Sequence, residues 1–273
     1  MALDVSGNLA LLSQLQHKDM LMFLLAVKSF ARQIRPRAVF VLNDGSLSNE
    51  DRALLGAHVP GTTVLELPQF RSATCPTGGC WERLLAISML VRDYYVIQLD
   101  SDTLSVGPID EVRDCVQRQT AFALGTWDNQ ECEEMREQWE TTARRKPGPG
   151  SHVQIVAEAN FHKLRDFETL RYIRGCAGFA GFPRRSFKRE FVERISGEMR
   201  AAIGNKWTEW GSEQVMSNIV VANIPGAVVL PHPKYADCQN MRLGETAFIH
   251  FIGSCRFEGG TYARLGAEVI EAL

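Results

Sequence analysis

The stretch YYVIQLDSDTL, residues 94–104, decides the fold class of this chain and indicates where its site lies. Residues 94–99 are largely apolar and predict a buried strand. Asp100 and Asp102 follow directly, separated by one serine. Two carboxylates at the end of a buried strand repel each other unless a cation lies beside them. The stretch therefore predicts either a cation site or, since such triplets are common, a solvated turn.

Strand-like and helix-like runs alternate through the first hundred residues. The predicted elements are a strand at 9–15, a helix at 18–34, a strand at 38–44, a helix at 48–58, a strand at 62–67, a helix at 81–93 and a strand at 94–99. Ser48 and Asp51 have nearly the spacing and chemistry of a helix capping box. This order predicts an α/β fold with a mostly parallel sheet and helices on both faces. Ligands bind such sheets beyond the carboxyl ends of the strands, where Asp100 and Asp102 are predicted to lie.

The second half is less regular. It predicts a charged helix at 131–146, a glycine-rich segment at 175–183, a helix at 211–223 and a strand at 245–253. No segment has the length and composition of a linker between domains. We therefore expect a single domain over residues 1–273.

Composition restricts the partners and the compartment. The chain has 273 residues and a net charge of −2, which does not favour a nucleic acid or an anionic membrane as partner. Its seven cysteines are scattered without CxxC pairs, so we expect free thiols and a cytoplasmic protein. The chain begins without a signal-peptide pattern. The apolar run at 20–27 is far shorter than the ~20 residues of a membrane span, so we expect no transmembrane segment.

Two motifs far apart in the chain resemble one known family. YYVIQLDSDTLSVGPIDEV (94–112) resembles the YLDxDxLxxGxIxEL signature of GT-A fold glycosyltransferases, and is most similar to glycosyltransferase family 8 and its bacterial relatives. HFIGSCR (250–256) resembles the HFxGxxK motif of that family, with Arg256 in the lysine position. The resemblance implies a Rossmann-like, mostly parallel sheet flanked by helices. It also implies a nucleotide-binding half at about 1–106 and an acceptor-side half at about 107–273.

The resemblance implies a metal site formed by Asp100, Asp102 and His250. Two carboxylates and one neutral imidazole suit Mn²⁺ better than Ca²⁺, and Mg²⁺ is the second choice. Such a metal acts as a Lewis acid that neutralises charge on the departing nucleoside diphosphate. By itself, a histidine such as His250 is more often an ordinary, partly buried residue than a metal ligand.

The same resemblance assigns residues to the donor. Arg83 is expected at the nucleotide end, and Gly253 and Arg256 at the diphosphate. Arginine in place of lysine can still grip phosphate, through a forked rather than a point-like contact. Asp44 is the candidate for the base or ribose, although NDGS (43–46) is equally typical of an ordinary turn.

GCAGFAGFPR (175–184) resembles the NxGxxxF segment of the family, which places Ala177 and Gly178 along the donor sugar. Cys176 stands in place of the family's asparagine, which points to a different donor sugar. The alternative is a tightly packed core strand.

SEQVMSN (212–218) resembles the DQDxLN segment, in which Glu213 and Gln214 border the reacting carbon. Val215 replaces the second aspartate. Trp207 and Trp210 flank this segment and are acceptor candidates, because aromatic faces stack on sugar rings. Tryptophans near a helix end are as often core residues.

These motifs together predict a metal-dependent glycosyltransferase that transfers a hexose from a UDP-sugar to an acceptor hydroxyl. The acceptor class stays open among a saccharide, a lipid-linked sugar, a protein and a small metabolite. The resemblance implies retention, with Gln214 beneath the anomeric carbon, whereas inversion needs a carboxylate base such as Glu213. Two alternatives are a non-catalytic sugar-nucleotide-binding protein and a sugar-1-phosphate nucleotidyltransferase. A nucleotidyltransferase is expected to have a glycine-rich loop after the first strand, and this sequence lacks one there.

Overall fold

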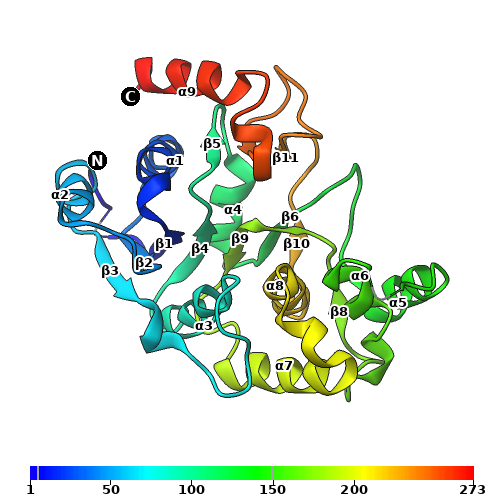
Figure 1. Cartoon of the computed structure of the whole chain (residues 1–273). Coiled ribbons are helices and arrows are strands. Elements are labelled where there is room, and N and C mark those ends of the chain that lie inside the picture. The colour runs from blue at the N-terminus through cyan, green and yellow to red at the C-terminus, as the bar shows by residue number, and fades with distance from the viewer. Residues whose placement is uncertain (5, 149) are drawn as a thin grey trace.

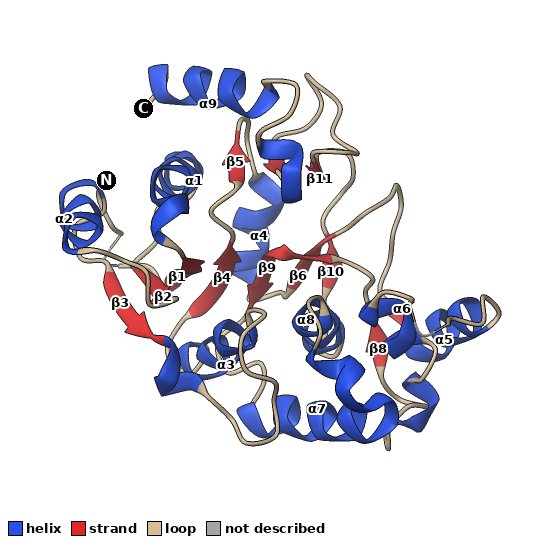
Figure 2. Cartoon of the chain, in the orientation of Figure 1, coloured by secondary structure: helices blue, strands red, loops and turns tan. Residues whose placement is uncertain are grey.

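A seven-stranded sheet forms the centre of the molecule, and helices cover both of its faces (Figures 1 and 2). The computed structural model describes residues 1–4, 6–148 and 150–273. The strand order is β10-β6-β9-β4-β1-β2-β3. These strands are β1 Leu9–Leu15, β2 Ala38–Asn43, β3 Thr63–Glu66, β4 Tyr95–Leu99, β6 Phe122–Leu124, β9 Cys176–Phe182 and β10 Val228–Val229. The mostly parallel α/β sheet predicted from the sequence is confirmed.

The first half follows the predicted alternation closely. β4, β1, β2 and β3 lie side by side and run parallel. They are connected by α1 Met20–Gln33, α2 Asn49–His58 and α3 Trp81–Leu90. α1 and α2 lie on one face of the sheet and α3 lies on the other (Figure 1). The capping box is confirmed: the Ser48 side chain accepts a hydrogen bond from the Asp51 backbone, and Asp51 accepts one from the Ser48 backbone. Short 3-10 turns at η1 His17–Asp19 and η2 Leu67–Phe70 adjoin these elements.

The second half completes the sheet. The glycine-rich segment forms β9, which runs antiparallel between β4 and β6. Gly181 is required there because a Cβ atom would lie 2.3 Å from the Phe122 ring. The predicted helix at 211–223 is α8 Ser212–Ala222, and the region predicted as one helix at 131–146 is β7 Glu133–Glu134 followed by α5 Met135–Ala143.

The remaining helices and turns surround these elements. They are α4 Asp110–Arg118, α6 Val153–Glu158, η3 Phe161–Lys163, α7 Arg189–Ile203 and η4 Gly204–Thr208, with β8 Arg171–Tyr172 pairing with β7. α7 and α8 lie on the same side of the central sheet as α3 (Figure 1).

A smaller sheet brings the segment around His250 back beside residues 100–102. It has the order β11-β12-β5 and consists of β11 Tyr235–Asp237, β12 Phe248–His250 and β5 Thr103–Ser105. β12 runs antiparallel to β5 and places His250 opposite Thr103. The strand predicted at 245–253 is therefore real but only three residues long. After it come η5 Gly253–Arg256 and α9 Thr261–Glu271, which packs near α1.

The expectation that all cysteines are free thiols is wrong for two of them. Cys238 and Cys255 form a disulfide with their Cα atoms 6.4 Å apart. Cys238 follows β11 and Cys255 lies in η5, so the pairing of β11 with β12 brings them together. The spacing of the cysteines in the sequence does not predict this disulfide, because the two cysteines meet only when the small sheet forms. The other five cysteines are free.

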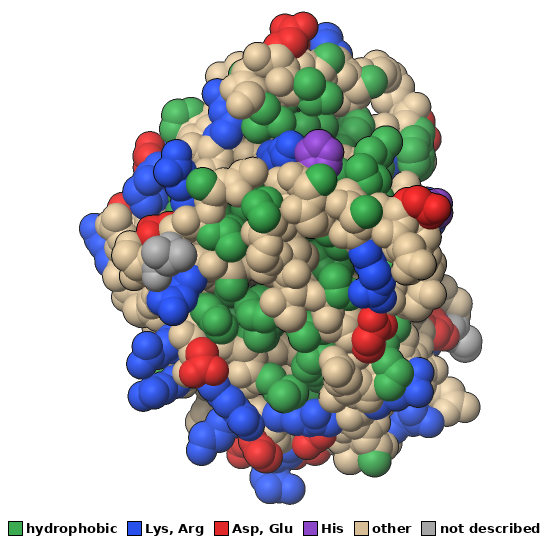
Figure 3. Space-filling model, turned by 90° about the vertical axis from the view of Figure 1, so that its left-hand side faces the viewer, with side chains coloured by type: hydrophobic (Ala, Val, Ile, Leu, Met, Phe, Trp, Pro, Cys, Tyr) green, Lys and Arg blue, Asp and Glu red, His purple; other side chains and the backbone are tan. Residues whose placement is uncertain are grey.

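Figure 3 shows the face that lies on the left of Figure 1. On this face basic side chains are more prominent than acidic ones, and the two kinds are interspersed. Within the described residues, none of the helices combines the length and the apolar character needed to span a membrane.

Candidate active site

A cavity of about 500 Å³ opens where β1 and β4 end and β9 begins. It lies at the carboxyl ends of the parallel strands, the general position of ligands in open α/β sheets. Most of the predicted site residues line it, namely Arg83, Asp100, Asp102, Ala177, Gly178, Trp210, Glu213, Gln214, His250, Gly253 and Arg256. Asp44 and Trp207 do not line this cavity.

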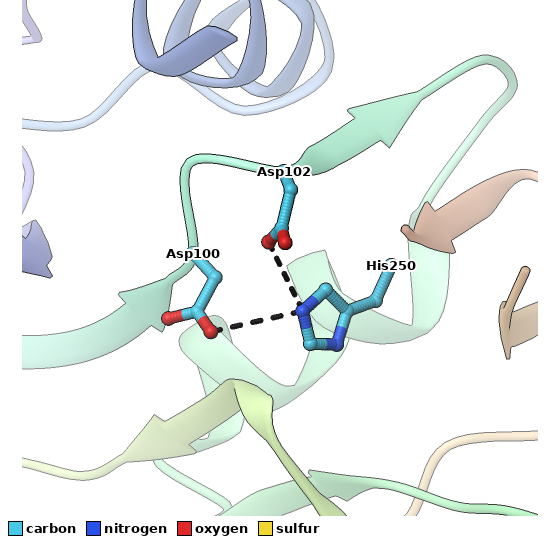
Figure 4. Close-up of side chains that lie close together, drawn as sticks. All are labelled: Asp100, Asp102 and His250. Carbon is cyan, nitrogen blue, oxygen red and sulfur yellow. Dashed lines mark hydrogen bonds and ion pairs between the residues drawn. The ribbon is translucent and has the colours of Figure 1, made fainter. Parts of the chain in front are cut away.

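The side chains of Asp100, Asp102 and His250 converge on one point of the cavity (Figure 4). Their ligand atoms all lie within 4.8 Å of one another. Nε2 of His250 lies 3.1 Å from Asp102 Oδ1 and 3.7 Å from Asp100 Oδ2. Two carboxylates and one imidazole form an oxygen and nitrogen donor set that fits a divalent cation such as Mn²⁺ or Mg²⁺.

Gly178 shapes this cluster. A Cβ atom at Gly178 would lie 2.1 Å from His250 Cε1, so only glycine leaves room for the imidazole. The Gly178 carbonyl also accepts a hydrogen bond of 2.9 Å from the Asp100 backbone. β9 therefore positions both the aspartate and the histidine.

His250 is held at both ring nitrogens. Nδ1 lies 3.1 Å from the Sγ atom of Cys176, and Nε2 faces the two aspartates. Burial lowers the pKa of His250, but Cys176 and Asp102 outweigh that effect and raise it well above its ordinary value. Burial likewise raises the pKa of Asp102, while His250 and Arg256 hold it below its usual range. His250 and Arg256 therefore both favour the charged form of the buried Asp102 carboxylate.

Arg256 brings a positive charge to Asp102 and Asp19. Its Nη1 lies 3.3 Å from Asp102 Oδ2 and 3.8 Å from Asp19 Oδ1. Its Nε is buried and has no partner among the described residues. Asp19, at the end of η1, was not predicted from the sequence, because a single aspartate before a helix has no distinguishing pattern.

Arg83 joins two acidic residues at the floor of the cavity. It is buried, donates a hydrogen bond to Asp100, and places Nη2 3.4 Å from Glu213 Oε2. Burial and the nearby Asp100 raise the pKa of Glu213 to about 7, against the opposing effect of Arg83. The other carboxylate oxygen of Glu213, Oε1, is buried without a partner among the described residues. Contact of Arg83 with a nucleotide remains a prediction.

Gln214 lies between β9 and α6. Its Oε1 accepts a hydrogen bond of 3.4 Å from the Ala177 backbone, and its Nε2 donates one of 3.4 Å to Gln154 Oε1. Gln154 also lines the cavity and was missed by sequence reasoning. Only the packing of α6 against α8 shows that it belongs to the site.

The two predicted acceptor tryptophans have opposite environments. Trp210 is 72% exposed and lines the cavity. Trp207 is fully buried, donates a hydrogen bond of 3.0 Å to Ser196, and packs edge-to-face on Trp81. A side chain with no exposed face cannot stack on a sugar, so the prediction for Trp207 is wrong.

The end of β1 supplies polar groups that were not predicted, whereas the predicted Asp44 lies in a turn. Gln14 and Gln16 line the cavity, and Gln14 Oε1 is buried without a partner among the described residues. The position rule for strand ends, applied to β1, would have found both. Asp44 accepts hydrogen bonds from the backbone and hydroxyl of Ser46. Its contact with a nucleoside remains a prediction.

Comparison with known proteins identifies the fold. No family model matches the sequence, and no curated protein matches it. Among solved structures, the bifunctional glycosyltransferase WbbM in its apo form matches 90% of this chain with 12% identity and a TM-score of 0.52. The glycosyltransferase GlyE of Streptococcus pneumoniae TIGR4 matches 97% of this chain with 11% identity and a TM-score of 0.55.

These matches cover 46% of WbbM and 63% of GlyE, so this chain corresponds to only part of either protein. At such identities the likeness shows a shared fold. The chain thus has an α/β fold found in glycosyltransferases, with an Asp-Asp-His cluster in its cavity. Membership of family 8 stays a prediction.

Proposed function

We propose that this chain is a metal-dependent glycosyltransferase that moves a sugar from a nucleotide-sugar to an acceptor hydroxyl. The observation that carries the proposal is the convergence of Asp100, Asp102 and His250 in one cavity at the carboxyl end of the sheet. The fold shared with WbbM and GlyE supports the class of reaction by analogy only.

In this proposal Asp100, Asp102 and His250 hold a divalent cation, Mn²⁺ first and Mg²⁺ second. A bound cation would act as a Lewis acid toward the diphosphate of a UDP-sugar. Asp100 and Asp102 bring two carboxylates to the site, and Gly178 leaves the space in which His250 meets them. His250 comes from the second half of the chain, so the proposed nucleotide-binding and acceptor-side halves share the metal.

The proposed donor contacts extend from the metal site in two directions. Arg256, together with the backbone at Gly253, would hold the diphosphate and stabilise the leaving group. Arg83 would act at the nucleotide end. Ala177 and Gly178 would border the donor sugar, since both line the cavity beside His250.

For the stereochemical course we propose retention. Gln214 would then lie beneath the anomeric carbon, and its contacts with Ala177 and Gln154 would fix the orientation of its amide. Trp210 would contact the acceptor. An inverting enzyme would instead use Glu213 as the base, and an NMR spectrum of the product anomer separates the two courses.

The deciding experiment measures UDP binding by calorimetry with Mn²⁺ and with EDTA. The native chain is compared with Asp102→Asn and with Asp237→Asn as the matched control. Asp237 is as buried as Asp102 and lines the same cavity, but it lies outside the cluster. We expect UDP to bind only with metal, and the loss of that binding in Asp102→Asn alone. Metal-independent binding, or no binding of UDP, contradicts the proposed site.

Turnover separates the proposed enzyme from its alternatives. A glycosyltransferase releases UDP from a UDP-sugar when an acceptor is present. A non-catalytic sensor binds the UDP-sugar with metal and releases no UDP. A sugar-1-phosphate nucleotidyltransferase instead releases pyrophosphate from UTP and a sugar phosphate.

A further inference from the structure

Arg174 lies at the cavity directly before β9 and has no role in the proposed metal site. It lines the cavity, and its side chain is 32% exposed. Its Nε donates a hydrogen bond of 3.0 Å to Glu158 Oε1. Within the described part of the chain, its two terminal nitrogens donate to no protein group. One edge of the guanidinium is therefore fixed while the other edge is available to a ligand.

The group that fixes Arg174 is a buried anchor. Glu158, at the end of α6, is 1% exposed. Besides Arg174 it accepts hydrogen bonds from Gln138 Nε2 at 3.1 Å, Thr142 Oγ1 at 3.2 Å and Tyr172 Oη at 3.3 Å. A carboxylate satisfied in this way is held in one orientation, and it holds the arginine in turn.

A chain of hydrogen bonds connects this anchor to Gln214. Gln214 donates to Gln154 at 3.4 Å, and Gln154 donates to the Tyr172 hydroxyl at 3.4 Å. The Tyr172 hydroxyl then donates to Glu158. Arg174 is thus connected by hydrogen bonds to Gln214, the residue proposed to lie beneath the anomeric carbon of the donor sugar. It does not belong to the Asp-Asp-His cluster.

The other two arginines of the cavity are occupied differently. Arg83 pairs with Asp100 and Glu213, and Arg256 pairs with Asp102 and Asp19. All four of those carboxylates line the cavity, so each positive charge is balanced inside it.

The partner of Arg174 lies elsewhere. Glu158 does not line the cavity, whereas Arg174 does, and the Arg174 side chain is 32% exposed. The available edge of its guanidinium matches a carboxylate or phosphate, which accepts two parallel hydrogen bonds from one guanidinium.

We propose that Arg174 determines specificity by binding an anionic group, a carboxylate or phosphate, on the sugar or the acceptor. This inference rests on the proposed function and names the substrate class of the same cavity. The anion has two sources: a hexuronate as the donor sugar, or an acidic acceptor. Pairs of probes that differ only in the anionic group distinguish these sources.

The donor arm measures calorimetric binding of UDP-glucuronate against UDP-glucose, and of UDP-galacturonate against UDP-galactose, all with Mn²⁺. The acceptor arm adds methyl glucuronide, methyl glucoside, glucose 6-phosphate or glucose to the protein saturated with Mn²⁺ and UDP. In one arm we expect the anionic probe to bind about tenfold tighter, the size of one charge-assisted contact. The arm that shows the preference identifies the source.

The preference should disappear in Arg174→Gln, while binding of UDP itself stays within twofold of the native value. Arg189→Gln is the matched control. Arg189 also pairs its Nε with a glutamate, at 2.9 Å, has a similar exposure of 29%, and lies outside the cavity. Arg174→Gln leaves Glu158 buried without its cation. Two further variants are therefore measured, namely the double variant Arg174→Gln with Glu158→Gln, and the single variant Arg174→Lys. The double variant removes both charges, and the lysine keeps the charge without the fork.

Equal affinity of the native protein for every anionic probe and its neutral counterpart overturns the proposal. The proposal is also overturned if the folded variants that lack Arg174 still bind the anionic probe more tightly than its neutral counterpart. Failure of UDP to bind with Mn²⁺ is a separate result, because it overturns the proposed function and therefore also the assignment of Arg174 to a sugar substrate.

Discussion

Arg256 Nη1 lies 3.3 Å from Asp102 Oδ2, so the proposed diphosphate-binding residue contacts a proposed metal ligand. A cation at Asp102 must compete with this guanidinium, whereas a bound diphosphate would attract Arg256 away from it. Cation and nucleotide should therefore assist each other in binding, with Arg256 as the connection between them.

The first prediction concerns Arg256→Gln. Without UDP, this variant should bind Mn²⁺ several-fold tighter than the native protein, because a competing positive charge is gone. With Mn²⁺ present, it should bind UDP about tenfold more weakly, because a phosphate contact is lost. Manganese titrations followed by electron paramagnetic resonance, with and without UDP, measure both. Arg264→Gln, which removes an exposed pair on α9, should change neither affinity. Weaker metal binding in Arg256→Gln without UDP would refute the competition.

The second prediction concerns stabilisation by metal. Mn²⁺ at about 100 times its Kd should raise the free energy of unfolding by about 2.7 kcal/mol, because only the folded chain assembles the three ligands. His250→Gln should lose most of the corresponding rise in Tm, judged against its own Tm in EDTA. The control is His232→Gln. His232 also pairs with an aspartate, Asp128, but both residues lie outside the cavity. An equal Mn²⁺-induced rise in both variants would argue against His250 as a ligand.

The third prediction concerns Gly178→Ala. The new methyl group would overlap the His250 ring, where a Cβ lies 2.1 Å from Cε1. Displacing the ring should cost about 1–3 kcal/mol of stability and weaken Mn²⁺ binding. Gly197→Ala on α7 is the matched control, since its Cβ would have no atom within 4 Å. Urea unfolding and a manganese titration measure the two effects. Native metal affinity in Gly178→Ala would show that the imidazole does not need this space.

The fourth prediction concerns pH. Burial raises the pKa of Glu213 from 4.5 to about 7, so the folded chain keeps this proton to a higher pH than the unfolded chain. Between those pH values the folded state binds more protons, and stability falls as pH rises. The loss attributable to Glu213 should reach about 3 kcal/mol above pH 7 and be absent below pH 4.5.

Glu213→Gln should remove this loss. Its unfolding free energy in urea and EDTA, measured at pH 5 and pH 8, should decline less with pH than that of the native chain. Glu245→Gln, which removes a carboxylate that is 63% exposed, should keep the native decline. A native-like decline in Glu213→Gln would contradict the raised pKa.

The fifth prediction concerns the disulfide. Thiol titration of the denatured protein should count five thiols before reduction and all seven after it. Cys238→Ser with Cys255→Ser should lose about 3 kcal/mol, as expected for a loop closed by cysteines 17 residues apart. Because Cys255 precedes Arg256, UDP binding should weaken as well. Seven thiols before reduction would show that the pair is open.

Local chemistry made much of the fold predictable. Strand and helix periodicities, with the cap at Ser48, depend on residues near one another in the chain, and these elements appear within a few residues of their predicted bounds. Asp100 and Asp102 were found for a similar reason, because polar residues directly after a buried strand mark the carboxyl end of the sheet. His250 was found by resemblance to a motif rather than by periodicity.

Contacts between distant segments were decided only by the tertiary structure. Asp102 and His250 are 148 residues apart, and the pairing of β12 with β5 brings them together. Trp207 is an example, since a tryptophan beside a helix can belong to the core or to a binding surface, and only its packing in the structure shows which. The Cys238–Cys255 bond and the Arg174–Glu158 pair also join elements that no short spacing connects. Local patterns in the sequence were enough to predict the order of strands and helices along the chain and the position of the two carboxylates. Their partners depended on which distant segments the sheets bring side by side, which local patterns do not contain.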